Sequence, residues 1–202
     1  MEDEAGGFEQ KAFFEFHLYT LGRRTTLPNN STKQIELFDQ ARRVPAERQL
    51  VYAATPGWYG NPEPLTERGY GVGQGAKVQT FLLLRNDRAS GLGMPLPAGR
   101  IRVSRLDAKD GSLEFIGEDT IGHTPRDERV RIRLGNAFDV VGERTQRDFT
   151  LDTQRRVMEE EITIELRNHK DEPVEVQVRE GLYRWSGWQV VSSSQPYEKV
   201  DA

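Results

Sequence analysis

The sequence predicts an all-β fold: an antiparallel β-sandwich, built as one sandwich or as two packed sandwich subdomains, with little or no helix. Three observations lead to this prediction. Apolar and polar side chains alternate with a period of two along many segments, as in strands with one buried and one solvated face. Turn-forming Gly, Pro, Asn and Asp residues separate these segments. No segment carries the apolar stripe, with a period of 3.6 residues, that marks an amphipathic helix.

The alternating segments are expected to be strands. In chain order they are Ala12–Thr20, Lys33–Phe38, Arg100–Leu106, Arg129–Leu134, Glu161–Leu166 and Val174–Val178. The segment Val78–Asn86 is apolar almost throughout, which favours a central strand covered on both faces. The segment Thr153–Glu161 contains helix-forming residues, but Met158 continues the even-numbered apolar face of Ile162 and Ile164. We therefore expect it to be a strand, in a total of about eleven, which is typical of a sandwich.

The predicted organisation is an acidic tail over residues 1–11 followed by a β-sandwich domain over residues 12–202. A candidate internal boundary lies near residues 107–111, where Asp and Gly form a turn signal. The tripeptide Leu-Arg-Asn ends two predicted strands, at Leu84–Asn86 and at Leu166–Asn168. The repeated tripeptide has two interpretations. It comes either from an old duplication of a sandwich unit or from residue preferences that are common at the ends of strands.

The composition excludes several classes of protein. A formal net charge of -4 gives no general attraction to nucleic acid. The absence of Cys excludes thiol nucleophiles, thiolate zinc sites and disulfides. No apolar run approaches the roughly 20 residues of a membrane span, and the acidic first residues lack a signal-peptide core. We expect no nucleic-acid partner, no membrane span, no metal and no cofactor.

Residues 169–172, His-Lys-Asp-Glu, are four consecutive titratable residues. They lie between Asn168 and Pro173, which both favour a bend between strands. A metal site or an acid–base pair needs side chains that converge in a pocket. We therefore expect an exposed hairpin tip and no catalytic centre.

The segment Gly122–Glu128 allows two interpretations. In one, His123 acts with Asp119 or Asp127 as the acid–base pair of a hydrolase. In the other, the segment is a turn in which His123 makes local hydrogen bonds. No HxH or HExxH spacing is present, so no residue is assigned a catalytic or metal-binding role.

The stretch Thr55–Gly75 predicts a loop longer than compact domains usually contain without a functional reason. It carries Trp58, Tyr59 and Tyr70 among Gly and Pro residues. Aromatic faces of this kind stack on sugar rings, and their OH and NH groups donate hydrogen bonds. These three residues are therefore candidate carbohydrate-binding residues. The alternative is that their rings pack against the sandwich and hold the loop in place.

Two further groups are candidates for docking a partner. Met94 and Leu96 lie in a loop rich in Gly and Pro, where they are either exposed anchors or part of a cover over one end of the sandwich. Arg129, Arg131 and Arg133 form a basic row on one face of a predicted strand. This row either binds an anionic surface or faces carboxylates of adjacent strands.

Five stretches, in this order, resemble one protein family. They are FFEFHLYTL, LRND…GLGMPLPAGRIRV, FIGEDTIGHTP, LGNAFDVVGER and ITIELRNHKDEPVEVQV, and they cover most of residues 13–197. The chain resembles the bacterial domain of unknown function numbered four-one-three-nine, which is distantly similar to mucoidy-inhibitor-type proteins. The resemblance implies an all-β domain exported to the bacterial envelope, and it supplies no enzymatic activity or catalytic residue.

The chain departs from this family in two ways. It lacks the long N-terminal portion with its signal peptide, and it ends at SSSQPYEKVDA, where one or two further strands are expected. A missing final strand would leave an open sheet edge that invites pairing. We therefore expect a non-enzymatic module in the periplasm or on the cell surface, which contacts an envelope protein or itself. A carbohydrate-binding module and a hydrolase around His123 are the alternatives.

Overall fold

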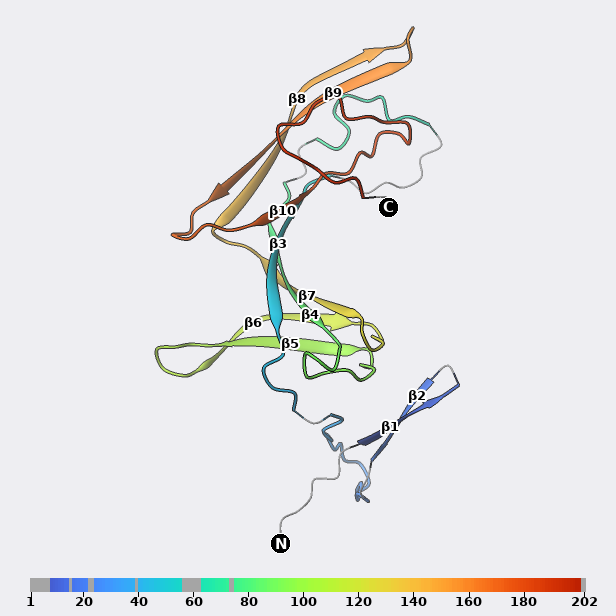
Figure 1. Ribbon diagram of the computed structural model, residues 1–202, viewed down its shortest axis with the longest axis vertical. Helices are drawn as coiled ribbons and strands as arrows, with labels where there is room; N and C mark the ends of the chain where they lie inside the picture. The colour runs from blue at the N-terminus through green and yellow to red at the C-terminus, as the bar shows by residue number, and fades with distance from the viewer. Residues whose placement is uncertain are drawn as a thin grey trace. The chain divides into compact units, whose positions relative to one another are not determined.

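The computed structural model describes residues 8–14, 16–21, 24–38, 40–55, 63–72 and 75–200, and these residues form strands, turns and irregular segments without a helix (Figure 1). The all-β prediction is therefore confirmed. The strands within the described residues are β1 (Phe8–Phe13), β2 (Phe16–Leu21), β3 (Ala46–Ala53), β4 (Gln79–Arg85), β5 (Gly99–Leu106), β6 (Leu113–Ile121), β7 (Arg129–Asn136), β8 (Val140–Asp152), β9 (Val157–Asn168) and β10 (Val176–Arg179).

The strands form one four-stranded sheet and three two-stranded sheets. The four-stranded sheet has the order β10-β3-β4-β7, and the pairs are β1-β2, β5-β6 and β8-β9. The three pairs are antiparallel hairpins, whereas β10 runs parallel to β3. A period-two pattern indicates a strand but does not specify the direction of its neighbour, so the parallel pair could not be predicted from it.

The chain divides into two compact units that are discontinuous in sequence. Unit 1 contains residues 1–47 and 82–132, and unit 2 contains residues 48–81 and 133–202. The chain passes from one unit to the other within β3, β4 and β7.

Unit 2 has a sandwich-like core between the β3–β10 pair and the β8–β9 hairpin. The buried cluster consists of Leu50, Tyr52, Ala54, Val78 and Val140, with Ile164, Val174 and Val176 packed against it. Because these residues come from both sheets, the core depends on a close approach of one sheet to the other. Gly142 of β8 makes this approach possible, since the ring of Tyr52 occupies the place where a Cβ would stand.

In unit 1, Asn86 holds together two loops at the end of β4. Its side chain is fully buried, and its Nδ2 donates to the carbonyl oxygens of Met94 (2.7 Å) and Pro125 (2.8 Å). Its Oδ1 accepts from the Gly93 N–H (3.1 Å). The backbone of Asn86 donates to Glu128 (2.9 Å) and accepts from Asp127 (2.8 Å). Every polar group of this buried amide therefore has a partner, as burial requires.

Three sequence predictions differ from the structure. The predicted strand Ala12–Thr20 is instead the hairpin β1-β2, with Phe14 at its turn in a left-handed conformation (φ 57°). The predicted strand Lys33–Phe38 is irregular and unpaired among the described residues. Residues 169–172 connect β9 to β10, which belong to different sheets, so they are a link and not a hairpin tip.

The segment Thr153–Glu161 agrees with its prediction from Val157 onward. β9 starts there, and Met158, Ile162 and Ile164 share the half-buried face of that strand. The preceding residues, up to Arg156, form the turn of the hairpin.

Replacing Gly142 by Ala tests the close contact between the two sheets of unit 2. The added methyl group overlaps the Tyr52 ring, so we expect the free energy of unfolding to fall by about 1–3 kcal/mol, as overpacking typically costs. Gly99→Ala is the matched control, because a Cβ at Gly99 meets open space. Chemical denaturation of both variants measures the difference, and equal stabilities would contradict the packing described.

Candidate functional site

Arg184 organises a buried polar cluster of unit 2. Its side chain, which is 8% exposed, makes two hydrogen bonds to the carboxylate of Glu160 in β9, Nε to Oε2 (3.0 Å) and Nη2 to Oε1 (3.1 Å). The guanidinium also lies 4.6 Å from the ring centroid of Phe149 in β8. A paired carboxylate and an aromatic face together compensate for the burial of the charge.

The remaining hydrogen bonds of Arg184 fix part of the predicted aromatic loop. Its Nη1 donates to the carbonyl oxygens of Leu65 and Glu67 (2.9 Å each), and its Nη2 donates to that of Arg68 (3.2 Å). The backbone of Leu65 donates in turn to the carbonyl of Arg184 (2.9 Å). Residues 65–68 are therefore held by one side chain through their backbone, independently of their own side chains.

Tyr70 packs against the same cluster. Its ring centroid lies 5.8 Å from that of Tyr183, and the buried Tyr183 donates its OH to the Tyr70 carbonyl (2.8 Å). Gly71 follows with φ +74°, and a Cβ there would collide with the Tyr183 hydroxyl. Tyr70 is thus half-buried, and part of its ring contacts protein. Trp58 and Tyr59 lie outside the described residues.

A second ion pair, with a buried arginine and a partly buried carboxylate, lies near the first. Arg144 of β8, with a side chain 4% exposed, contacts Glu180 through Nε (3.0 Å) and Nη2 (2.7 Å). Burial raises the pKa of Glu180, and the hydrogen bonds from Arg144 oppose that rise. Gln146 donates to Glu160 (2.7 Å). These charged groups bind one another and the backbone, and thus have a structural part in unit 2.

The residues predicted to dock a partner differ in their exposure to solvent. Met94 and Leu96 are half-buried, and Leu96 exchanges two backbone hydrogen bonds with Thr124 (2.9 Å each). Arg129, Arg131 and Arg133 are exposed on β7, opposite the buried Val130 and Ile132. Within the described part of the chain, β7 is an edge strand of the four-stranded sheet and pairs with β4 alone.

His123 is exposed, and its Nδ1 accepts a hydrogen bond from the Ala98 N–H (3.2 Å). The backbone N–H of Asp127, a residue with φ 66°, donates to the carbonyl of Asn86. Within the described residues, no group of three or more His, Asp or Glu side chains is arranged to hold a metal ion. A surface hollow along Val190–Tyr197 contains none of the predicted site residues.

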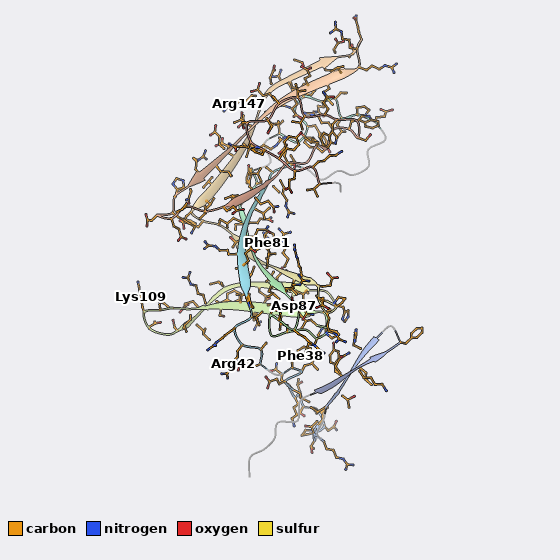
Figure 2. All side chains as sticks on the ribbon, in the orientation of Figure 1. Phe38, Arg42, Phe81, Asp87, Lys109 and Arg147 are labelled. Carbon is orange, nitrogen blue, oxygen red and sulfur yellow. The ribbon has the colours of Figure 1, made fainter. Side chains whose placement is uncertain are left out.

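The outer face of the β5–β6 hairpin was not singled out by the sequence. Near the turn, Leu106 pairs with Leu113, and Ser104 pairs with Phe115. The three apolar residues of this group are 61%, 71% and 63% exposed, in the order Leu106, Leu113 and Phe115. They form a continuous apolar surface, which we call the hairpin patch. Figure 2 labels Lys109 in the turn, at the free end of this long ribbon.

A β-bulge creates the hairpin patch. The register of β5 and β6 shifts between Val103 and Ser104, so that Ile116 is the extra residue of β6. On the far side of the bulge, Gly117 is buried together with the half-buried Ile101 and Val103. Without the extra residue, strict alternation would place Phe115 and Leu113 on that inner face. The bulge turns both side chains outward instead.

The turn that closes the hairpin is well ordered by its own side chains. Asp107 accepts from the Lys109 N–H through Oδ1 (2.8 Å) and pairs with Ser112 through its backbone (2.8 Å). Asp110 accepts from the Ser112 N–H (2.9 Å), and the hydrogen bonds of Ser112 lower the pKa of Asp110. Gly111 takes a positive φ of 76°. The carboxylate of Asp110 is therefore ionised at neutral pH.

Comparison with family models found no match, and neither curated proteins nor solved structures gave a significant match to this chain. The described part of the chain contains no helix that could cross a membrane. The family resemblance of the sequence stays a prediction.

Replacing Arg184 by Met tests whether this residue anchors the loop. The change removes two hydrogen bonds from the partly buried Glu160 carboxylate and leaves several backbone carbonyls without their donor, so we expect a loss of about 3–5 kcal/mol in the free energy of unfolding. The control is Arg147→Met, since the Arg147–Glu165 pair is about half exposed and such pairs contribute about 0–1 kcal/mol. Chemical denaturation gives both values. Similar small losses in the two variants would show that Arg184 is not the anchor.

The raised pKa of Glu180 predicts a pH dependence. A carboxyl group whose pKa is higher in the folded than in the unfolded state stabilises the fold at low pH. That contribution is lost as pH rises from about 4.5 through the raised value. The stability of the wild type relative to Glu180→Gln should therefore decrease between pH 4 and pH 7. Denaturant titrations at several pH values measure it, and a relative stability that increases over this range would refute the assignment.

Proposed function

We propose that this chain is a non-enzymatic structural module that acts through protein–protein contact, with the hairpin patch as its contact surface. The observation that carries the proposal is the exposure of Leu106, Leu113 and Phe115, side by side on one face. Single exposed apolar residues are common on protein surfaces, but contiguous ones mark interaction sites.

The energetics of the hairpin support a bound state. A two-stranded hairpin is marginally stable in water unless one face is covered. The inner face of β5–β6 is partly covered through Ile101, Val103 and Gly117. The outer face near the turn holds three large side chains, and burying each fully would contribute about 1.5–3 kcal/mol. A partner on this face would therefore stabilise the hairpin and itself be held by it.

The surroundings favour contact over chemistry. The buried side chains of Arg144 and Arg184 are paired with the partly buried carboxylates of Glu180 and Glu160. His123 is exposed and accepts a hydrogen bond from the Ala98 N–H. For carbohydrate binding, Tyr70 offers only part of a ring that also contacts Tyr183.

The location of the module in the bacterial envelope is part of the proposal, and it is supported by the family resemblance of the sequence. An envelope protein or a second copy of this chain would then be the partner. An extracytoplasmic module without cysteine has no thiol to form a stray disulfide in an oxidising compartment.

A photo-crosslinking residue at position 115, in cells that express the protein naturally, tests both parts of the proposal. We expect the chain in the envelope fraction, and a single discrete adduct that disappears when Leu113→Asp is added. The same crosslinker at the exposed Val191, outside the patch, is the control and should give no such adduct. A chain always recovered alone at position 115 would refute the contact function, and a cytosolic chain would refute the envelope location.

A further inference from the structure

We propose that the partner of the hairpin patch is the hairpin patch of a second copy of this chain, packed face to face about a two-fold axis. This inference rests on the proposed contact function and names its partner. It follows from how apolar and charged residues are ordered along the outer face of β5–β6.

The outer face has three zones in succession. The base of the hairpin carries Arg100 and Arg102, which both contact Glu118 across the strands (3.3 Å and 2.7 Å). The hairpin patch follows. The turn comes last and carries Asp107, Lys109 and Asp110. The base therefore has a net charge of +1 and the turn one of −1, with the apolar zone between them.

A two-fold axis through the hairpin patch brings unlike charges together. Such an axis places each residue of one copy over the residue equally far from the axis on the other side. Strands rise about 3.4 Å per residue, so the turn lies roughly 7–15 Å from a centre near Arg105. Arg102 and Arg100 lie roughly 10–17 Å from it on the other side. The turn of each copy then covers the base of the other, while the two apolar zones meet.

The charged side chains that would meet in this dimer are exposed to solvent or already fixed in position. Arg100 and Arg102 have side chains 62% and 70% exposed, although each contacts Glu118. The hydrogen bonds within the turn fix Asp107 and Asp110 before any partner arrives, which keeps the entropic cost of docking low. A parallel arrangement of the hairpins would instead place turn on turn and base on base, with like charges facing each other.

The size of the face sets the strength expected of the dimer. One side of a single hairpin is smaller than the roughly 800 Å² per partner of a standard interface. We therefore expect dissociation constants in the micromolar range or weaker, and a dimer that forms at high local concentration.

Sedimentation analysis of the full chain over a concentration series tests the inference. The wild type should pass from monomer to dimer, and Phe115→Asp should weaken the dimer at least about tenfold, since it buries a carboxylate against the partner's apolar zone. Val191→Asp, at an 81% exposed position outside the patch, is the matched control and should leave the dimer unchanged. A dimer that resists Phe115→Asp would use another face and would overturn the proposal.

A charge exchange tests the geometry directly. Arg102→Glu alone and Asp110→Lys alone should each weaken self-association, because each creates two like-charged contacts across the axis. An equimolar mixture of the two variants should recover dimers, since both contacts again join opposite charges. Asp110→Asn keeps an acceptor for the Ser112 N–H and separates the loss of charge from any change in the turn. Failure of the mixture to recover would refute the antiparallel arrangement.

The outcomes separate this inference from the function on which it rests. The wild-type chain could stay monomeric at all concentrations while the crosslinker at position 115 gives an adduct heavier than a dimer. That result would overturn the self-contact but leave the contact function standing. A monomer without any adduct overturns both. A dimer-mass adduct that disappears with Leu113→Asp supports both.

Discussion

The hydrogen bonds of Arg184 are the interaction on which the structure of unit 2 depends. One guanidinium joins three elements that are distant in sequence: the loop carbonyls of Leu65 and Glu67, the carboxylate of Glu160, and the ring of Phe149. The loop around residue 65 has no strand partner of its own among the described residues. Its backbone polar groups would otherwise have to be solvated or left without partners. Arginine suits this place because its planar fork offers five donors in fixed directions, which lysine cannot reproduce.

In unit 1, the buried Asn86 joins irregular segments as Arg184 does in unit 2, but it uses a neutral amide and not a charged group. Both residues satisfy backbone groups of irregular segments, and both do so while buried, where an unmade hydrogen bond costs the full desolvation of the group. Neither was predicted to matter. An Asn at a strand end and an Arg near the end of the chain are common on surfaces, so their residue types carry no signal of burial. Their partners lie 7 to 119 positions away in sequence, and only the fold brings these groups together.

Alternation of side chains predicts the fold class and several strands, and the reason is physical. In β7, Val130 and Ile132 are buried while the arginines between them are exposed, which is the pattern that a strand with one wet face requires. The same pattern fails at Lys33–Phe38, because a strand also needs a neighbour to accept its backbone hydrogen bonds, and alternation says nothing about neighbours. The hairpin patch could not be predicted either. Periodicity places Phe115 on the face of Gly117, and one extra residue, Ile116, reverses that assignment. Nothing in the residue types marks the bulge.

The β8–β9 hairpin also contains a bulge that changes the face on which an aromatic side chain lies. In β8–β9 the register shifts between Gln146 and Asp148, so that Arg147 is the extra residue. The shift brings Phe149 onto the same face as Glu160, its cross-strand partner, where Arg184 lies over the ring. One bulge thus turns an aromatic side chain inward onto a buried cation, and the other turns an aromatic side chain outward into solvent. The inward ring has its partner within the chain. The outward ring of Phe115 lies on a hairpin whose turn is already fixed by Asp107 and Asp110, and it is 63% exposed among the described residues. Burial of this ring is what the proposed contact with a second copy would supply.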